Sequence, residues 1–286
     1  MELHETTSTG EADELRYVKA NGLRFAYLEA GEGPLALLVH GFPDTPHGFR
    51  ELVPALVSAG YRVVAPYTRG YAPTEIPATR VTRIDELATD VLALVEALGH
   101  RSCVLVGHDW GAATAYLAAA KEPSRVEKLV TIGIPHPAAL EPSLRTLWVG
   151  RHFIDFKIPG AVSRVARDDL SHIDRLYRRW SPTWRFGPEE TAPVKASFAD
   201  RASLDAALGY YRGFSPRERS EALRGKIRVP TLAVAGLDDP AIGVDAYEKA
   251  RRKFSADYRV AALPGGHFVH RECPVAFRDA VLDFLG

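Results

Sequence analysis

Residues 104–116, VLVGHDWGAATAY, contain the feature that decides the fold of this chain. An apolar run reaches Gly107, the chain turns, and an alanine-rich segment begins at Gly111. This pattern predicts a buried strand, a sharp turn and the start of a helix. In the G-x-S-x-G form of this turn a nucleophilic serine lies at the apex, whereas the apex residue here is Asp109. The sequence therefore raises the question of which chemistry needs a carboxylate in that place.

The bulk composition is that of an ordinary globular chain. Of its 286 residues 46% are hydrophobic and 25% are charged, as in typical globular domains. Lys plus Arg and Asp plus Glu number 36 each, so the net charge is zero and nothing indicates a nucleic-acid partner. Two cysteines suggest neither a disulfide framework nor a metal site. We see no signal peptide and no apolar run long enough for a membrane span, and expect a cytoplasmic protein without a membrane partner.

Strand-like and helix-like segments alternate along most of the chain. Runs typical of strands occur at 15–20, 23–31, 35–41, 61–66, 103–107, 126–134, 230–236 and 258–265. Helices are expected at 48–60, 83–99, 113–123, 245–254 and 274–286. This alternation predicts an α/β fold, with a parallel sheet that is covered by helices on both faces.

The character of the sequence changes after the Pro-His-Pro stretch at 135–137. From about 138 to 222 there are no strand-like runs, and arginine, tryptophan and proline are frequent. We therefore expect a core domain formed by 1–137 and 223–286, with a helical cap (lid) domain, 138–222, inserted into it.

Asp109 has two possible roles. As a helix N-cap, its side chain would bind the first backbone N–H groups of the following helix. The flanking glycines instead favour a sharp turn that pushes the apex side chain clear of the backbone. The stretch at 40–43, His-Gly-Phe-Pro, follows a strand-like run, where this architecture places one oxyanion-hole donor, the N–H of Phe42. The second donor would be the N–H of Trp110.

Two further loops contain groups that a nucleophile needs. Asp238 and Asp239 follow the run at 230–236, and His267 follows two glycines, with His270 three residues later. Taken singly, each is as readily an ordinary turn or a structural histidine. Their order along the chain (nucleophile, acid, histidine) is that of the α/β-hydrolase triad, in which the histidine is the base and the acid orients it.

The sequence resembles the α/β-hydrolase superfamily over nearly the whole chain after its first dozen residues. Within that superfamily it looks like the epoxide hydrolase and haloalkane dehalogenase branch, which uses an aspartate nucleophile. The motifs that carry the resemblance are HGFP at 40–43, GHDWGA at 107–112, PHP at 135–137 and GHFVHRE-P at 266–274. The resemblance implies an eight-stranded, mostly parallel sheet with a helical cap.

The resemblance also implies roles for individual residues. The family pattern Gly-x-x-Asp, counted from Gly236, makes Asp239 the acid, with Asp238 as the alternative. His267 is the implied base, and His270 matches a position that is not catalytic in the family.

An aspartate nucleophile suits chemistry at saturated carbon. Asp109 can displace a leaving group there and form an alkyl ester of the enzyme. Water activated by His267 can then attack the carboxyl carbon, and the N–H groups of Phe42 and Trp110 would bind the oxyanion. No metal, nucleotide or flavin motif occurs, so we expect no metal and no cofactor. The expected partners are a small-molecule epoxide and water.

The leaving group distinguishes the branches of the family. An opened epoxide is an alkoxide and needs a proton donor, which two cap tyrosines supply in the epoxide hydrolase branch. LGYYRGF at 208–214 resembles the second tyrosine motif and selects Tyr211, whereas RHFIDFKIPG at 151–160 resembles the first but has His152 in place of tyrosine. We expect this pair to bind the epoxide oxygen. The expected pocket lining consists of Phe153, Trp180, Trp184 and Phe186.

His152 alone does not decide between the branches, because fluoroacetate dehalogenases have histidine there too. Those enzymes have arginine directly after the nucleophile and again three residues later, where this chain has Trp110 and Ala113. They also have tryptophan after the cap histidine, where this chain has Phe153, and haloalkane dehalogenases typically have asparagine in place of Phe42. An epoxide hydrolase is therefore favoured. A haloalkane or haloacid dehalogenase is the alternative, a non-catalytic ligand-binding protein is a minor one, and a homodimer, common among related enzymes, stays open.

Overall fold

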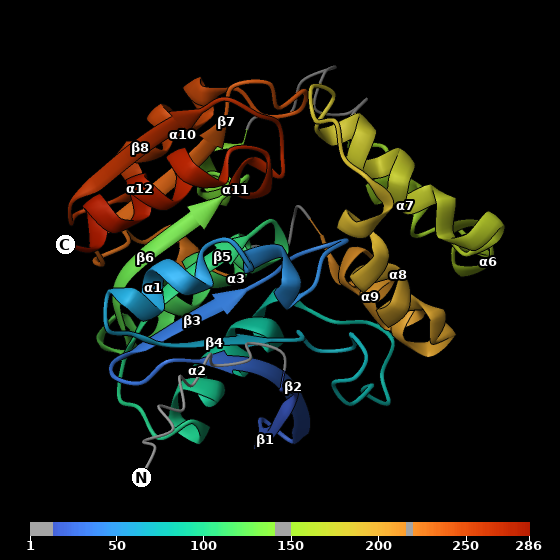
Figure 1. Cartoon of the computed structure of the whole chain (residues 1–286), viewed down its shortest axis with the longest axis horizontal. Helices are drawn as coiled ribbons and strands as arrows, with labels where there is room; N and C mark the ends of the chain where they lie inside the picture. The colour runs from blue at the N-terminus through green and yellow to red at the C-terminus, as the bar shows by residue number, and fades with distance from the viewer. Residues whose placement is uncertain (1–13, 141–149, 216–219) are drawn as a thin grey trace, which may run out of the picture.

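A twisted sheet of eight strands forms the centre of the molecule, in the order β1-β2-β4-β3-β5-β6-β7-β8 (Figure 1). The structure is a computed structural model that describes residues 14–140, 150–215 and 220–286. The strands are β1 (Arg16–Ala20), β2 (Leu23–Ala30), β3 (Leu35–Val39), β4 (Arg62–Pro66), β5 (Cys103–His108), β6 (Val126–Ile132), β7 (Thr231–Gly236) and β8 (Tyr258–Leu263).

β2 runs antiparallel to its neighbours β1 and β4, and every pairing from β4 through β8 is parallel. The mostly parallel, eight-stranded sheet expected from the sequence is therefore confirmed. Because parallel strands end at the same edge of a sheet, the loops after β3, β5, β7 and β8 open on one side of the molecule.

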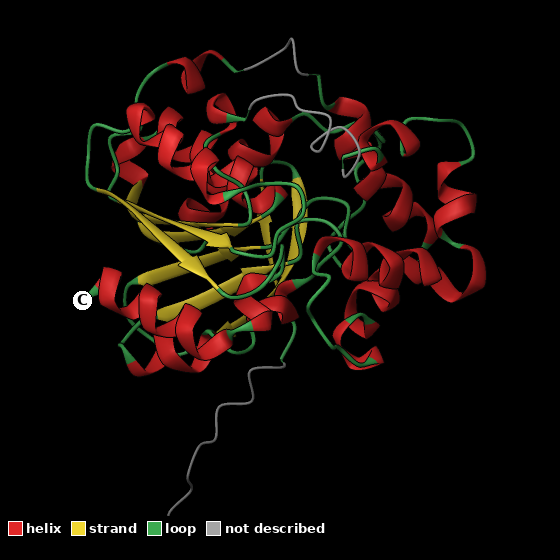
Figure 2. Ribbon diagram, turned by 90° about the horizontal axis from the view of Figure 1, so that it is seen from above, coloured by secondary structure: helices red, strands yellow, loops and turns green. Residues whose placement is uncertain are grey.

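Helices cover both faces of the sheet (Figure 2). The helices α2 (Ile84–Ala97), α3 (Trp110–Lys121) and α10 (Val244–Ala250) share an apolar core with one face. The helices α1 (Val53–Ser58), α11 (Val269–Glu272) and α12 (Pro274–Leu285) share another with the opposite face. Along β3, Leu37 and Val39 belong to the first core, and Ala36 and Leu38 to the second. Burial of both faces explains why β3 is an uninterrupted apolar run in the sequence.

Five helices of the described chain lie between β6 and β7, to one side of the sheet (Figure 1). They are α5 (His152–Asp155), α6 (Ala161–Val165), α7 (Arg167–Trp180), α8 (Ala192–Ala199) and α9 (Arg201–Gly213). We call residues 150–215 the helical insertion. Its apolar cluster includes Phe42 and Trp110 from the loops at the edge of the sheet. The domain boundaries at 137/138 and 222/223 stay a prediction.

Short 3₁₀ turns complete the described elements, at Pro46–Phe49, Pro123–Arg125, Pro137–Ala139, Pro188–Glu190, Glu221–Arg224 and Arg251–Lys253. The helix expected over 48–60 is shorter than predicted, since α1 begins only at Val53. Pro54 is the reason, because proline lacks an N–H and is tolerated in the first turn of a helix but not in its interior. The helix expected over 245–254 likewise ends at Ala250 and continues as a 3₁₀ turn.

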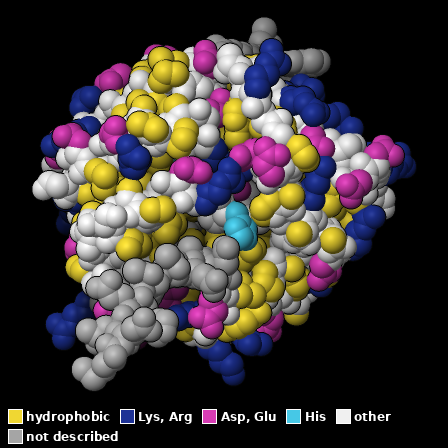
Figure 3. Space-filling model, viewed as in Figure 1, with side chains coloured by type: hydrophobic (Ala, Val, Ile, Leu, Met, Phe, Trp, Pro, Cys, Tyr) yellow, Lys and Arg dark blue, Asp and Glu magenta, His cyan; other side chains and the backbone are white. Residues whose placement is uncertain are grey.

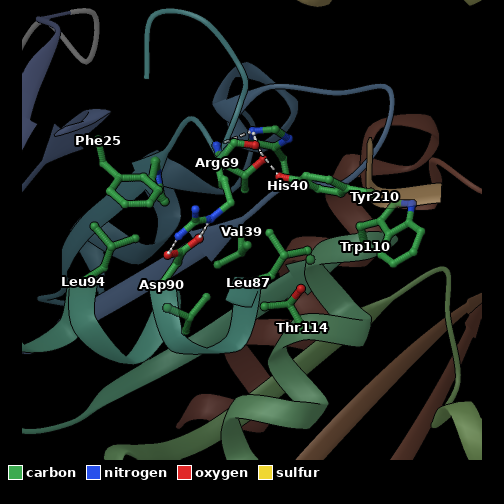
Figure 4. A pocket seen from close by; sticks show the side chains of 14 residues that line it. Phe25, Val39, His40, Arg69, Leu87, Asp90, Leu94, Trp110, Thr114 and Tyr210 are labelled. Carbon is green, nitrogen blue, oxygen red and sulfur yellow. Dashed lines mark hydrogen bonds and ion pairs between the residues drawn. The ribbon is translucent and has the colours of Figure 1, made fainter. Parts of the chain in front are cut away.

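A buried ion pair joins α2 to the loop after β4 and, through it, to the insertion. Arg69 binds Asp90 with two hydrogen bonds, of 2.7 Å from Nε and 2.6 Å from Nη2, and Asn21 donates a third to this carboxylate. The hydroxyl of Tyr210, in α9, donates to the carbonyl of Arg69 over 2.6 Å. Arg69, Asp90 and Tyr210 border a cavity of about 20 Å³ that Trp110 also lines (Figure 4). It has room for about one water molecule.

The surface matches the zero net charge. On the face shown in Figure 3, acidic and basic side chains are interspersed with hydrophobic ones. No helix among residues 14–140, 150–215 and 220–286 is long and apolar enough to cross a membrane.

Candidate active site

Asp109 stands at a strained turn between β5 and α3. Its backbone angles are φ 53° and ψ −117°, a region that non-glycine residues seldom occupy and that costs roughly 1–3 kcal/mol. Asp109 precedes α3 directly, but its side chain makes no capping hydrogen bond. The N-cap role is therefore wrong. The turn instead presents the carboxylate, which is 13% exposed, at the edge of the sheet.

Glycines at three positions make this turn possible. A Cβ atom on Gly107 would collide with the backbone of Gly111, and a Cβ atom on Gly111 would collide with the carbonyl of Val39. On Gly41, a Cβ atom would lie 2.5 Å from Oδ1 of Asp109. Close approach of backbones, rather than chain flexibility, therefore requires glycine here.

The two carboxylate oxygens of Asp109 have different surroundings. Oδ1 accepts a hydrogen bond of 2.8 Å from the backbone N–H of Phe42. Oδ2 lies 3.4 Å from Nε2 of His267. Trp110 is the first residue of α3, so its N–H has no acceptor within that helix. Of the two expected oxyanion donors, the N–H of Phe42 therefore binds the carboxylate, and the N–H of Trp110 belongs to the residue that follows Asp109 in the chain.

His267 lies between two carboxylates. Its Nδ1 atom is 3.4 Å from Oδ2 of Asp239, and Oδ1 of Asp239 accepts from the N–H groups of Ala241 (2.7 Å) and Ile242 (3.1 Å). The alternative acid, Asp238, accepts instead from Thr183 at the surface, over 3.3 Å. The structure therefore brings Asp239, and not Asp238, to the imidazole.

The charges around His267 control its protonation. Burial lowers the pKa of His267, but hydrogen bonds to Asp109 and Asp239, and the negative charges of both, outweigh burial and raise it to about 10. While Asp109 is ionised, His267 is therefore an imidazolium at neutral pH. Any reaction that neutralises Asp109 removes part of this support.

Tyr211 and His152 approach the site from the insertion. Their rings are in edge contact, with centroids 5.4 Å apart. Tyr211, 1% exposed, also contacts Trp110 and Phe153, at centroid distances of 5.4 and 4.9 Å. Burial, and then the charge of Asp109, raise the pKa of Tyr211 well above its usual value. Tyr211 is thus a neutral phenol that can donate a proton.

The four residues expected to line the pocket fall into two groups. Trp180 contacts both His267 and His152, with ring centroids 5.4 and 4.8 Å away, and Phe153 contacts Tyr211. Trp184 packs elsewhere. Its ring contacts are with Tyr177, Phe186 and Phe268. Phe186 in turn contacts Tyr177.

The insertion is joined to the loop of His267 by hydrogen bonds that the sequence analysis missed. The N–H of His267 donates to the carbonyl of Trp180 over 3.0 Å, and the N–H of Phe268 donates to Oγ of Ser181 over 3.2 Å. Ser181 and the N–H of Gly266 both donate to Glu272, over 2.5 and 2.9 Å. The partners from 266 to 272 lie in the GHFVHRE-P motif, whereas nothing in the sequence indicated Trp180 and Ser181 as their partners.

Arg271 forms a second link and was also missed. This arginine is 9% exposed and donates to Oδ1 of Asp44 over 3.1 Å and to the hydroxyl of Tyr177 over 2.9 Å. It also donates to the carbonyl of Glu190 over 2.6 Å and pairs with the carboxylate of that residue. It thus connects the loop of His267 both to the core and to the insertion.

One group of described residues has the composition of a metal site. Ligand atoms of Asp44, His108 and His270 lie within 4.8 Å of one another, and all three residues are buried. They lie outside the arrangement around Asp109, and we return to them below.

Comparisons with known proteins place this geometry in a family. A family model described as alpha/beta hydrolase fold matches residues 34–273. Human epoxide hydrolase 4 is 45% identical over 94% of this chain and 77% of that protein, and epoxide hydrolase A of Mycobacterium tuberculosis is 31% identical over 94% and 96%. The crystal structure of Bacillus megaterium epoxide hydrolase in complex with an inhibitor is 25% identical, with a TM-score of 0.85, over 94% of this chain and 99% of that one. The chain therefore belongs to the α/β-hydrolase fold family, as an epoxide hydrolase-like hydrolase.

Proposed function

We propose that the protein hydrolyses an epoxide to a vicinal diol through an alkyl ester of Asp109. The observation that carries the proposal is the arrangement of the Asp109 carboxylate, with Oδ1 on the N–H of Phe42 and Oδ2 facing His267. The names of the related proteins support an epoxide as the substrate. In this proposal residues 138–222 act as a cap over a core formed by 1–137 and 223–286.

In the first step Oδ2 of Asp109 attacks a carbon of the epoxide ring. The new bond is Asp109 Oδ2–C, and the C–O bond of the ring breaks, leaving its electron pair on the ring oxygen. Tyr211 gives its proton to this oxygen, and His152 helps to orient the ring, because both side chains enter the site from the insertion. A positioned general acid of this kind contributes about 10²–10⁴-fold to the rate.

In the second step water hydrolyses the ester. Oδ1, held by Phe42, becomes the carbonyl oxygen and then the oxyanion, and each donor to it is worth about 3 kcal/mol. His267 takes a proton from the water that attacks the carboxyl carbon of Asp109 and then protonates the departing diol oxygen, which is Oδ2. Asp239 holds the imidazole in the orientation that this transfer needs.

The protons balance without a net gain or loss. Esterification removes the charge of Asp109, so the pKa of His267 falls and the imidazolium releases one proton. This equals the one proton that the ring oxygen takes from Tyr211, whose phenolate is thereby restored to phenol. Collapse of the tetrahedral intermediate leaves Asp109 as a carboxylic acid, which passes its proton to His267, so that the carboxylate and the imidazolium are both regenerated.

The test is the intact mass of the His267→Gln variant after separate incubation with a terminal aryl epoxide, a chloroalkane and a haloacetate. Without its base the variant is expected to accumulate the ester, and the mass is expected to rise by the whole epoxide. Asp109→Asn, which lacks the nucleophile, is the matched control and gains no mass. An adduct from a halide alone, of the substrate mass less HX, would instead make the protein a dehalogenase. No adduct with any of the three would contradict the proposed ester chemistry for these substrate classes and favour a binding role.

A further inference from the structure

A buried polar cluster lies behind the proposed base, and the reaction above does not use it. Asp44 lies in the loop after β3, His108 ends β5, and His270 lies in α11. All three are at most 3% exposed. Oδ2 of Asp44 is 3.9 Å from Nδ1 of His108 and 3.8 Å from Nε2 of His270. Both distances are too long for hydrogen bonds.

The cluster touches the loop of the base through His108. Nε2 of His108 lies 3.1 Å from the backbone carbonyl of His267, and the two rings are 5.0 Å apart. A carbonyl oxygen only accepts, so the proton of His108 must be on Nε2. Burial, and then the neighbouring His270 and His267, hold the pKa of His108 well below its usual value. A neutral ring with its proton on Nε2 has a bare lone pair on Nδ1.

Two acceptors therefore face each other in the interior. Oδ2 of Asp44 and Nδ1 of His108 each lack a hydrogen-bond partner, as do both ring nitrogens of His270, of which Nε2 lies nearer to Asp44. The other oxygen of Asp44 already accepts from the N–H of Thr45 and from Arg271, over 2.8 and 3.1 Å. A buried polar atom without a partner destabilises the folded state. A group that donates two hydrogen bonds and accepts one would satisfy all three residues of the cluster.

A water molecule meets this requirement better than a metal ion. It donates to Asp44 and His108 and accepts from the N–H of His270, which are the three hydrogen bonds that a buried water typically makes. A divalent cation would find a single carboxylate, and the guanidinium of Arg271 already pairs with that group. Burying two further positive charges beside Arg271 without another anion is unfavourable.

We propose that Asp44, His108 and His270, joined by one buried water molecule, position the catalytic base. The cluster keeps His108 on the carbonyl of His267 and so keeps the imidazole against Asp109. None of the three residues touches the substrate, so they are positioning residues. The proposal rests on the function proposed above, in which His267 acts as base only in the hydrolysis of the ester. Loss of the cluster is therefore expected to slow hydrolysis and spare ester formation.

The test compares His270→Leu, which removes the polar group, with His270→Gln, whose amide can donate again. Both steps are measured in single turnovers with a terminal aryl epoxide, by rapid quench and intact mass. We expect His270→Leu to slow hydrolysis of the ester by at least about tenfold, which corresponds to about 1.4 kcal/mol. The ester then accumulates, while the rate of ester formation stays within about twofold of wild type. Gln is expected to restore most of the hydrolysis rate. Equal slowing of both steps, or no change, would overturn the proposal.

A second measurement does not depend on the reaction. Long-range ¹H–¹⁵N NMR of the wild-type protein is expected to show His108 neutral with its proton on Nε2, and the protected Nε2–H signal is expected to weaken in His270→Leu and return in His270→Gln. A proton on Nδ1, or one equivalent of bound metal by elemental analysis, would refute the cluster as described. If NMR shows the expected state of His108 but neither the wild type nor any variant forms an ester, the proposed function is wrong and the polar cluster stands.

Discussion

The Nε2 atom of His267 lies 3.4 Å from Oδ2 of Asp109, so the two side chains form an ion pair as long as Asp109 is unmodified. This contact is one of the interactions that raise the pKa of His267 to about 10. In the proposed reaction, His267 must later act as a base. Esterification resolves the conflict, because the ester of Asp109 has no charge with which to hold the proton.

The first prediction concerns this coupling. In Asp109→Asn, which mimics the neutral ester, the pKa of His267 is expected to fall by more than about one unit, equivalent to about 1.4 kcal/mol. ¹H–¹³C NMR titration of the histidine ring measures it directly. An unchanged pKa would mean that Asp239 alone supports the imidazolium.

The shift also makes stability depend on pH. The pKa of His267 is raised from 6.5 to about 10 on folding, so its contribution is complete below about pH 6.5 and is lost as the pH rises through about 10. The free energy of unfolding, measured with urea at intervals across this window, is expected to decline more steeply in wild type than in Asp109→Asn. Parallel curves would contradict the linkage.

The adjacent tyrosines of α9 offer a matched pair of variants. Tyr211→Phe removes the proposed acid, and we expect ester formation to slow by about 10²–10⁴-fold. Tyr210→Phe removes only the hydrogen bond to the carbonyl of Arg69, and we expect a loss of about 1 kcal/mol in stability with the rate of ester formation preserved. Rapid quench and urea unfolding measure the two effects. If Tyr211→Phe forms the ester at the wild-type rate, Tyr211 is not the proton donor.

A methyl group at Gly41 would collide with the side chain of Asp109, the proposed nucleophile. Because the Cβ atom would lie 2.5 Å from Oδ1 and 2.6 Å from Cβ of Asp109, we expect Gly41→Ala to displace the carboxylate and slow ester formation by about 10²-fold or more. Gly225→Ala is the control, since its nearest neighbour would be the carbonyl of Ala222 at 3.7 Å. Single-turnover rates with an aryl epoxide compare the two. Equal rates would show that the loop moves aside without consequence.

The buried pair of Arg69 and Asp90 predicts a large effect on stability. Asp90→Leu leaves the guanidinium without its two hydrogen bonds, and we expect the free energy of unfolding to fall by about 3–5 kcal/mol. The double variant with Arg69→Met removes the unpaired charge, so it is expected to recover much of the loss. Urea unfolding measures both. If the double variant is as unstable as the single one, packing rather than charge dominates at this site.

Most of the fold was accessible from the sequence because its signals are local. β3 and β5 are buried on both faces and therefore appear as uninterrupted apolar runs. Gly107 and Gly111 could be interpreted from their spacing alone, because the collisions that require them occur within one turn or with the adjacent strand. The helix over 48–60 was overestimated where one residue, Pro54, outweighed the periodicity.

The contacts that support the candidate site could not be predicted from the sequence. Arg271 and Asp44 are 227 positions apart, and neither belongs to a pattern that indicates its partner. The hydrogen bond between the N–H of His267 and the carbonyl of Trp180 involves only backbone atoms, so the types of the two residues do not indicate it. The place of Trp184 in the pocket stays a prediction, and the sequence did not indicate that its ring packs on Tyr177 and Phe268.

In the proposed function, that backbone hydrogen bond would link substrate entry to reactivity. Since Trp180 ends α7 and accepts the N–H of His267, a movement that lifts the end of α7 from the core also withdraws the imidazole from Asp109. An opened molecule would then lack its base at the moment when bulk solvent reaches the nucleophile. The protein would then bind its substrate in an open conformation and convert it in a closed one. The hydrogen bond between His267 and Trp180 would be present only in the closed conformation.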